Sequence, residues 1–303
     1  MAVLPCVDQA GGRLTFDVIQ GPPGSGDLFA VASNGNEVFV GGRSNRLFKR
    51  AIDGGAWVAL DAGLPDYTTI ESLGFGWNSL IVLGFENPMY PDGGNFGQQR
   101  RVGRLVNVST GDGRPLPADI QGGPPVPHLQ TNRSIITQSG DSKVYREATE
   151  STSQLMGVFG MEVTVTGEEG NWIFTDGGLS DLVTPTRVES PPPVTCRTLR
   201  GTTAAVSDTD AGLHRAVAVF GGTAFVCASL DRGPWSVTPV SSTSAVRGLT
   251  VSSSAVVGYD VDGLFSLGAP DAGLQRHCAP HLIQDLTPDL WAVGMNNTVL
   301  HGR

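Results

Sequence analysis

The sequence predicts an all-β fold, a seven-bladed β-propeller with four antiparallel strands in each blade; six blades are the alternative. The main observation is a run of β-branched or aromatic residues that stops at glycine and recurs along the chain. Its copies are 35 to 55 residues apart, about 42 on average, which is a typical blade length. They begin at Val38, Leu80, Ile135, Trp172, Val217, Val256 and Trp291. A run that stops at glycine is typical of a strand entering a tight hairpin.

Composition favours the same fold class. The 303 residues include 41 Gly and 20 Pro, which is more turn-forming sequence than helical proteins carry. The hydrophobic fraction of 40% is too high for a disordered chain. Length alone would suggest two domains, but seven blades of this size use the whole chain, so we expect residues 1–303 to form one domain.

Blade boundaries follow the turns between the runs. The first blade has strands predicted at 28–32, 37–40, 46–52 and 56–60, and the middle blades follow at about 68–120, 126–159, 160–200, 201–240 and 244–278. The last blade, 282–303, has only three predicted strands. Residues 13–19 alternate apolar and polar side chains and have no blade of their own. We therefore expect this N-terminal strand to complete the last blade and close the ring, which removes open sheet edges.

The last blade also carries a resemblance to a known group of proteins. Residues 289–301 read Asp-Leu-Trp-Ala-Val-Gly-Met-Asn-Asn-Thr-Val-Leu-His. This segment resembles the repeat of bacterial propellers in the broad WD40/YVTN and photosystem-assembly-factor-like group. The match covers these 13 residues, and the rest of the chain matches only in its period. The resemblance implies a fold and no single activity, because the group includes assembly, adhesion and scaffold proteins as well as lyases and hydrolases.

Charge narrows the partner classes. The net charge is −9 and the pI is about 5.0, whereas a nucleic-acid-binding protein usually carries a basic surface. The basic residues between Arg43 and Arg50 alternate along one predicted strand, as on a solvated face. No apolar stretch is long enough to span a bilayer. A protein or glycan partner is expected, without nucleic acid or a membrane span, and the oligomeric state stays open.

One candidate site lies along the first strand of each blade. In a propeller these strands line the central channel, and ligand sites form at its mouth. Polar residues occur in or beside them at Glu71, His128, Gln130, Glu162, Arg247, His281, Gln284 and Asp285. They form either a weak metal or small-ligand site, as in some propeller hydrolases and lactonases, or a polar, water-filled channel. Arg247 would repel a cation, so no metal or other cofactor is expected.

A second candidate is the insertion at residues 86–100, between two strands of the second blade. It is longer than the corresponding turns of the other blades and, with Arg101, concentrates apolar, aromatic and basic residues. These are Met89, Tyr90, Phe96, Arg100 and Arg101. Aromatic residues and arginine dominate binding hot spots, and loops on rigid scaffolds often carry function. The alternative is that Tyr90 and Phe96 fold back and cap the channel.

No catalytic motif accompanies these candidates. The chain lacks a Gly-x-Ser-x-Gly elbow, and its Pro-rich segment at 22–26 lacks the Gly-Lys-Ser/Thr end of a P-loop. The five histidines stand singly and are expected at the surface or in hairpins. The aspartates at 208–210 and 260–262 are too few for a calcium loop and predict Asx-turns.

The four cysteines do not follow a metal-binding spacing. Cys227 lies in an apolar run and is expected to be a buried free thiol, whereas Cys6, Cys196 and Cys278 could pair in an oxidising compartment. The chain has only two lysines, Lys49 and Lys143, and many Asp-Gly turns, as in exported bacterial proteins. An exported protein is expected; a cytosolic one is the alternative.

These observations predict a non-catalytic binding or scaffold module that recognises a protein or glycan through the channel-mouth face. The alternative function is a metal-assisted hydrolase or lyase with its site at the channel mouth.

Overall fold

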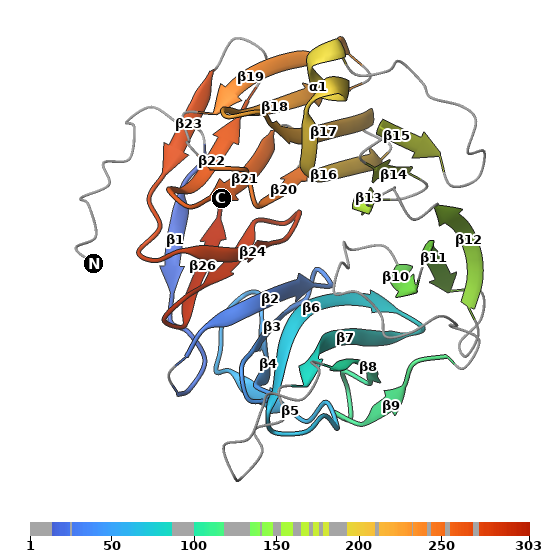
Figure 1. The fold of residues 1–303 in the computed structure, drawn as a ribbon. Helices are drawn as coiled ribbons and strands as arrows, with labels where there is room; N and C mark the ends of the chain where they lie inside the picture. Colours follow the sequence, from blue (N-terminus) through green and yellow to red (C-terminus); the bar gives the residue numbers. More distant parts are fainter. Residues whose placement is uncertain are drawn as a thin grey trace, which may run out of the picture. The chain divides into compact units, whose positions relative to one another are not determined.

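The computed structural model describes residues 14–24, 26–86, 100–117, 134–139, 141–147, 153–159, 165–169, 172–175, 178–181, 193–209, 212–231, 233–240, 244–251, 255–268 and 273–303. In these ranges the strands form seven antiparallel sheets, five of four strands and two of three (Figure 1). The predicted all-β class is confirmed, because the one helix in these ranges is the five-residue α1 (Val194–Thr198). No helix in this part of the chain has the length and apolar character to cross a bilayer.

The chain divides into two compact units, which we call the N-terminal unit (Gly21–Glu162) and the C-terminal unit (Met1–Gln20 with Val163–Arg303). The closure of all sheets into one ring, the number of blades and the single-domain expectation stay predictions.

The N-terminal unit contains three sheets. The first consists of β2 (Leu28–Ser33), β3 (Glu37–Gly42), β4 (Leu47–Ala51) and β5 (Val58–Leu60). The second consists of β6 (Thr68–Gly76), β7 (Ser79–Glu86), β8 (Arg100–Val106) and β9 (Gly113–Pro115), and the third of β10 (Ser134–Ser139), β11 (Asp141–Glu147) and β12 (Ser153–Phe159). β2 packs beside β6, and a core that includes Phe39, Ile70 and Leu80 fills the space between the first two sheets.

The C-terminal unit contains four sheets. Three follow in chain order: β13 (Val165–Glu169), β14 (Trp172–Thr175) and β15 (Gly178–Asp181); β16 (Arg200–Thr209), β17 (Gly212–Phe220), β18 (Ala224–Ser229) and β19 (Ser236–Val240); β20 (Gly248–Val251), β21 (Val256–Asp260), β22 (Gly263–Leu267) and β23 (Leu274–His277). The fourth combines β24 (Ile283–Leu286), β25 (Trp291–Gly294) and β26 (Thr298–Gly302) with β1 (Phe16–Ile19). The first strands are neighbours in the order β13, β16, β20, β24 (Figure 1).

The expected pairing of the N-terminal strand is confirmed. β1 runs antiparallel to β26, with Phe16 opposite Gly302 and Ile19 opposite Val299, and becomes the outer strand of the last sheet. The Arg303 side chain lies 2.9 Å from the Asp17 carboxylate across this pair.

The recurring glycines have two roles, of which only one was expected. Gly222, after the run that begins at Val217, has a φ of +89° in the turn after β17, as expected. Gly42 and Gly294 are the last residues of β3 and β25, Gly84 lies inside β7, and none of these three has a positive φ. Each faces the first strand of its sheet at very short range. A Cβ would lie 2.2 Å from the Thr69 carbonyl oxygen at Gly84, and 2.2 Å from the Leu282 carbonyl oxygen at Gly294. Gly42, Gly84 and Gly294 therefore permit close backbone approach, and none of the three supplies the positive φ of a turn residue.

The cysteine expectation was partly wrong. Cys227 is not a free thiol but forms a disulfide with Cys196, which ties α1 to β18. Both residues are buried in a cluster with Val217 and Val219. Cys278 is also disulfide-bonded. The apolar sequence around Cys227 correctly indicated a buried side chain. It did not indicate a free thiol, because a disulfide can be buried as well.

Polar residues of the C-terminal unit also differ from expectation. His214 and His277 are buried in strands rather than placed at the surface, and the His277 ring nitrogen Nε2 lies 2.7 Å from the Ser266 hydroxyl. The predicted Asx-turn at Asp260 is confirmed, because its Oδ1 accepts the Asp262 N–H. Asp260 is itself fully buried and binds Arg276 through both carboxylate oxygens at 2.8 Å.

The basic run from Arg43 to Arg50 is only partly solvated, because Arg43 is mostly exposed but Lys49 and Arg50 of β4 are packed. The Lys49 ammonium donates to the Val108 carbonyl at 2.7 Å and pairs with Glu37 at 2.9 Å. Arg50 stacks on Trp57. These contacts join β4 to β3, to the turn after β8 and to Trp57.

His301, in β26 of the last sheet, is a half-buried titratable residue. Its ring stacks on Trp291 at a centroid distance of 4.1 Å, and burial lowers its pKa below the usual 6.5 although Asp289 and Asp17 oppose the shift. The unfolded chain therefore binds a proton at a higher pH than the folded one. We expect the free energy of unfolding to fall as pH drops from 6.5 through the lowered pKa.

Urea unfolding at several pH values checks this prediction. His301→Phe keeps an aromatic ring against Trp291 and removes the titrating group. The variant should lose part of the acid sensitivity between these two pKa values. An unchanged pH profile would show that other groups carry the dependence.

Candidate functional site

The first strand of several sheets contains a bulge at the same place. The register with the second strand skips one residue in β2, β6, β13, β16 and β24. The skipped residues are Phe29, Glu71, Thr166, Thr202 and Gln284. In β20 the arrangement is similar, because Gly248 pairs with Tyr259 while the Arg247 N–H also donates to the Tyr259 carbonyl. We call these six positions the first-strand bulge residues.

A bulge re-aims side chains and is often found beside binding sites. An extra residue in one strand breaks the strict alternation between the two faces, so neighbouring side chains can point to the same side. The recurring glycines support this geometry: Gly42, Gly84 and Gly294 pair with the residue just before the bulge in β2, β6 and β24. The sequence pattern alone had indicated Glu71, Arg247 and Gln284, three of the first-strand bulge residues.

Two first-strand bulge residues of the C-terminal unit are in contact. The Arg247 guanidinium donates to the Gln284 side-chain oxygen at 3.4 Å, between β20 and β24. Arg247 is exposed, so its remaining donors can reach a ligand. Asp285 follows Gln284, and its Oδ1 accepts the Leu286 N–H at 2.9 Å.

Tyr259 lies beneath this pair. It is buried, and its hydroxyl donates to the Gln284 carbonyl. Burial, assisted by Asp285, raises the pKa of Tyr259 well above its usual value, so the phenol stays neutral. A Cβ at Gly248 would overlap the Tyr259 ring, which explains the glycine there. Tyr259 thus joins two sheets and is not available as a base at neutral pH.

In the N-terminal unit, Phe29 and Glu71 lie on the neighbouring strands β2 and β6. The Arg43 guanidinium stacks on the Phe29 ring at 5.5 Å and lies 3.6 Å from the Asp27 carboxylate. Arg43 is mostly exposed, so an aromatic ring and a cation meet at this end of the sheet. Such pairs combine apolar contact with directional hydrogen bonding.

The other predicted site residues are only partly described. Tyr90, Phe96, His128 and Glu162 lie outside the described residues, as does most of the insertion. Arg100 and Arg101 begin β8, where their backbones pair with Glu86 and Phe85 of β7. Sequence reasoning missed Phe29, Thr202 and Tyr259. Phe29 could have been found from the spacing between the recurring glycine Gly42 and its partner strand β2.

The chemistry of the described residues is hydrogen bonding and charge. Among the described residues, no group of three or more His, Cys, Asp or Glu side chains is placed to hold a metal ion. The absence of a metal or other cofactor stays a prediction. The hydroxyl of Ser266 and the ring of His277 form a close pair, but this pair is buried between β22 and β23, with Phe16 against the histidine ring.

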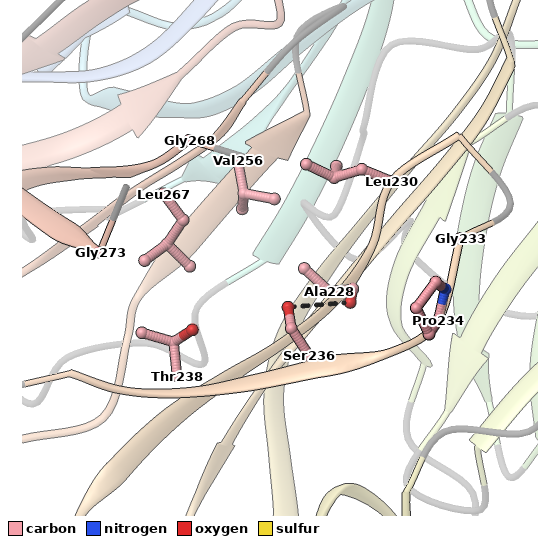
Figure 2. A pocket seen from close by; sticks show the side chains of 10 residues that line it. All are labelled: Ala228, Leu230, Gly233, Pro234, Ser236, Thr238, Val256, Leu267, Gly268 and Gly273. Atoms are coloured by element: carbon pink, nitrogen blue, oxygen red, sulfur yellow. Dashed lines mark hydrogen bonds between the residues drawn. The ribbon is translucent and has the colours of Figure 1, made fainter. Parts of the chain in front are cut away.

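A small pocket lies elsewhere in the C-terminal unit, between the β18–β19 and β21–β22 hairpins (Figure 2). Its volume is about 110 Å³, and Leu230, Val256 and Leu267 contribute apolar walls. The Ser236 hydroxyl at its edge donates to the Ala228 carbonyl. Organic ligands usually occupy pockets of about 300 Å³ or more, so this space suits no more than one side chain.

Comparison with solved structures identifies the fold. The chain is similar to YCF48 bound to D1 peptide, with 15% sequence identity and a TM-score of 0.57 over 97% of this chain and 99% of that one. It is also similar to YCF48 from Cyanidioschyzon merolae, with 12% identity and a TM-score of 0.53 over 94% and 98% of the two chains. The WD40 β-propeller domain of Doa1 gives 12% identity and a TM-score of 0.53 over 95% and 96%.

No protein-family model matches the sequence, and no curated protein matches it significantly. The structural likeness spans nearly the whole chain at low identity, so it supports an architecture and not an activity. The predicted propeller class is thereby confirmed: the chain has a WD40-like β-propeller fold.

Proposed function

We propose that this protein is a non-catalytic binding module that recognises a polypeptide partner through its first-strand bulge residues and the loop at 86–101. The observation that carries the proposal is the repeated bulge, which in the C-terminal unit brings the polar side chains of Arg247 and Gln284 into contact on the neighbouring strands β20 and β24. Glu71 occupies the same position in β6 of the N-terminal unit.

The chemistry of these residues favours binding over catalysis. Arg247 and Gln284 offer directional donors and acceptors suited to peptide groups and carboxylates. Their buried neighbour, Tyr259, is neutral and already donates its proton in a hydrogen bond. A structure with the same fold was solved as YCF48 bound to D1 peptide, which supports a peptide as the ligand class.

Within this proposal the loop supplies the main anchors. Tyr90 and Phe96 provide apolar contact, and Arg100 and Arg101 pair with an acidic partner. A glycan, the other partner class that the sequence favours, would be bound through the same polar groups. Arg247 is an exposed positive charge on a protein whose net charge is −9, so it marks a place where a carboxylate can bind. Polypeptides carry carboxylates and neutral glycans do not. The proposal therefore commits to a polypeptide.

Replacing residues 87–99 with Gly-Asn tests the role of the loop. Glu86 pairs directly with Arg100, so a two-residue turn can join β7 to β8 without changing their register. We expect an unchanged melting temperature and an affinity lower by about 100-fold or more for the partner captured from the native host and then purified. Isothermal titration calorimetry measures the loss.

Two further variants locate the site. Arg247→Ala should weaken binding by about tenfold through the first-strand surface, and Val58→Ala, at an exposed position of β5, should leave it unchanged. If the loop replacement binds normally and only Arg247→Ala weakens binding, the loop is a tolerated insertion. Normal binding by both the loop replacement and Arg247→Ala would refute the proposed surface.

Export to an oxidising compartment is part of the proposal. The disulfide between Cys196 and Cys227 and the disulfide-bonded Cys278 support it, because such bonds are rare in reducing cytosol. Thiol alkylation of protein from fractionated native cells checks it: free thiols in a cytosolic fraction would count against export.

A further inference from the structure

A second candidate site lies at the turn end of the β6–β9 sheet, in the N-terminal unit. It is a pocket of about 390 Å³, which is within the usual range for small ligands. Two turns form its walls, the β6–β7 turn at Trp77 and Asn78 and the β8–β9 turn at residues 107–112. None of the first-strand bulge residues is among the described residues that line it.

The first wall is fixed by a buried tryptophan. Trp77 and Asn78 have φ values of 50° and 51°, in the left-handed region that a bulky residue seldom adopts. The Trp77 side chain is fully buried against Ile81, Leu83 and Leu105, which offsets the backbone strain. The turn therefore holds the Trp77 carbonyl in place, where it accepts hydrogen bonds from Ser79 and Arg114 at 3.2 and 3.0 Å.

The second wall is held by a local hydrogen-bond network. The Asn107 side chain accepts the N–H groups of Ser109 and Thr110 at 2.9 and 3.2 Å. The Asn107 N–H donates to the Asp112 carbonyl at 2.9 Å, and the Asp112 N–H donates to the Thr110 hydroxyl. Because these bonds hold the loop, it needs little further ordering when a ligand binds. Asp112 is exposed on this loop.

The polar groups of the lining determine the ligand class. Asn78, Asp112 and Arg114 are exposed residues of the pocket and bring a carboxamide, a carboxylate and a guanidinium to its lining, with one guanidinium nitrogen already donating to the Trp77 carbonyl. Together they supply several donors and several acceptors, and the opposite charges of Asp112 and Arg114 favour neither an anion nor a cation. Trp77 is the one large apolar residue in the described lining, and its side chain is buried.

A hydroxyl group both donates and accepts a hydrogen bond, and neighbouring hydroxyls on a ring match planar carboxylate, amide and guanidinium groups. We infer that this pocket binds a neutral, hydroxyl-rich ligand, a saccharide unit. The site is independent of the proposed polypeptide-binding surface, so the two can succeed or fail separately.

Saturation-transfer NMR on the full chain tests this inference. The probes are the methyl glycosides of glucose, galactose and mannose together with N-acetylglucosamine, each at several millimolar. At least one probe should give a signal, with a dissociation constant on the order of 1 mM, because a single sugar ring has few atoms to contribute.

Two variants assign the signal to the pocket. Asn78→Gly removes the carboxamide, and glycine tolerates the left-handed φ, so the turn should persist. Asp112→Ala removes the exposed carboxylate and leaves the loop bonds of Asn107 in place. Each should weaken binding by about tenfold. The matched controls, Asn296→Gly with a φ of 54° and Asp53→Ala in an exposed turn, should bind normally.

The absence of a signal from all four probes would overturn the inference. Binding that is unchanged in both Asn78→Gly and Asp112→Ala would place the sugar elsewhere and overturn it as well. Melting temperatures of the variants show that a loss of signal is not a loss of fold.

Discussion

Replacing Gly84 with alanine is expected to destabilise the protein by about 3 kcal/mol or more. The new Cβ would lie 2.2 Å from the Thr69 carbonyl oxygen and 3.1 Å from its carbonyl carbon. Both atoms belong to the backbone of β6, so no side chain can rotate away. Relief requires β6 and β7 to separate, which weakens their ladder beside the bulge at Glu71. Urea unfolding measures the loss of free energy.

Gly222→Ala is the matched control. Gly222 lies in a turn and has a φ of +89°, and no atom lies within 4 Å of the position that a Cβ would take, so alanine there is strained but does not collide. Its expected cost is about 1 kcal/mol. Gly294→Ala, with its Cβ 2.2 Å from the Leu282 carbonyl oxygen, should behave like Gly84→Ala. If Gly84→Ala costs no more than Gly222→Ala, close backbone approach does not explain Gly84 and Gly294.

The period of these glycines predicted the architecture correctly but for an incomplete reason. A β-branched run before glycine is typical of a hairpin, and several strands do end near such residues. The structure shows that Gly84 lies inside β7, opposite Ile70, where a side chain would collide with the neighbouring strand. The sequence shows that such a position has no side chain, but it does not show which neighbouring backbone leaves no room for one.

The candidate site shows the same limit. Glu71, Arg247 and Gln284 could be selected because each is polar in a strand that should be mostly apolar. That selection did not include Phe29, which is apolar but occupies the same bulge position in β2. A strict alternation of side chains between the two faces of a strand cannot predict a bulge. The bulge adds one residue, and every later residue then lies on the opposite face from the one that alternation predicts.

Long-range pairing was the least predictable feature. The disulfide joins Cys196 to Cys227 across 31 residues, and the apolar run around Cys227 indicated burial without its partner. In contrast, the pairing of β1 with β26 could be predicted, because the last sheet had one strand too few and the N-terminus one too many. Counting elements succeeded where local patterns had no information.

Deleting residues 1–20 should destabilise the last sheet by about 3–5 kcal/mol and cause aggregation. β1 supplies every described partner on the outer edge of β26, where Val299 and Leu300 are fully buried. Beyond the strand, the backbones of Thr15 and Arg303 exchange two further hydrogen bonds, of 3.0 and 2.9 Å. Removal would expose this edge and its apolar side chains to other molecules. Chemical unfolding and size-exclusion chromatography measure both effects.

Point variants in β1 separate packing from the loss of chain. Phe16 contacts the His277 ring at 5.4 Å and packs on the cluster around Leu264 and Ile283, so Phe16→Ala should cost about 1–2 kcal/mol. Val18 lies on the same strand but is 70% exposed, so Val18→Ala should change stability by less than about 0.5 kcal/mol. Equal effects of the two would mean that β1 contributes only backbone pairing. A truncated protein that stays monomeric and equally stable would show that β26 does not need β1, and the last sheet would then be complete with three strands.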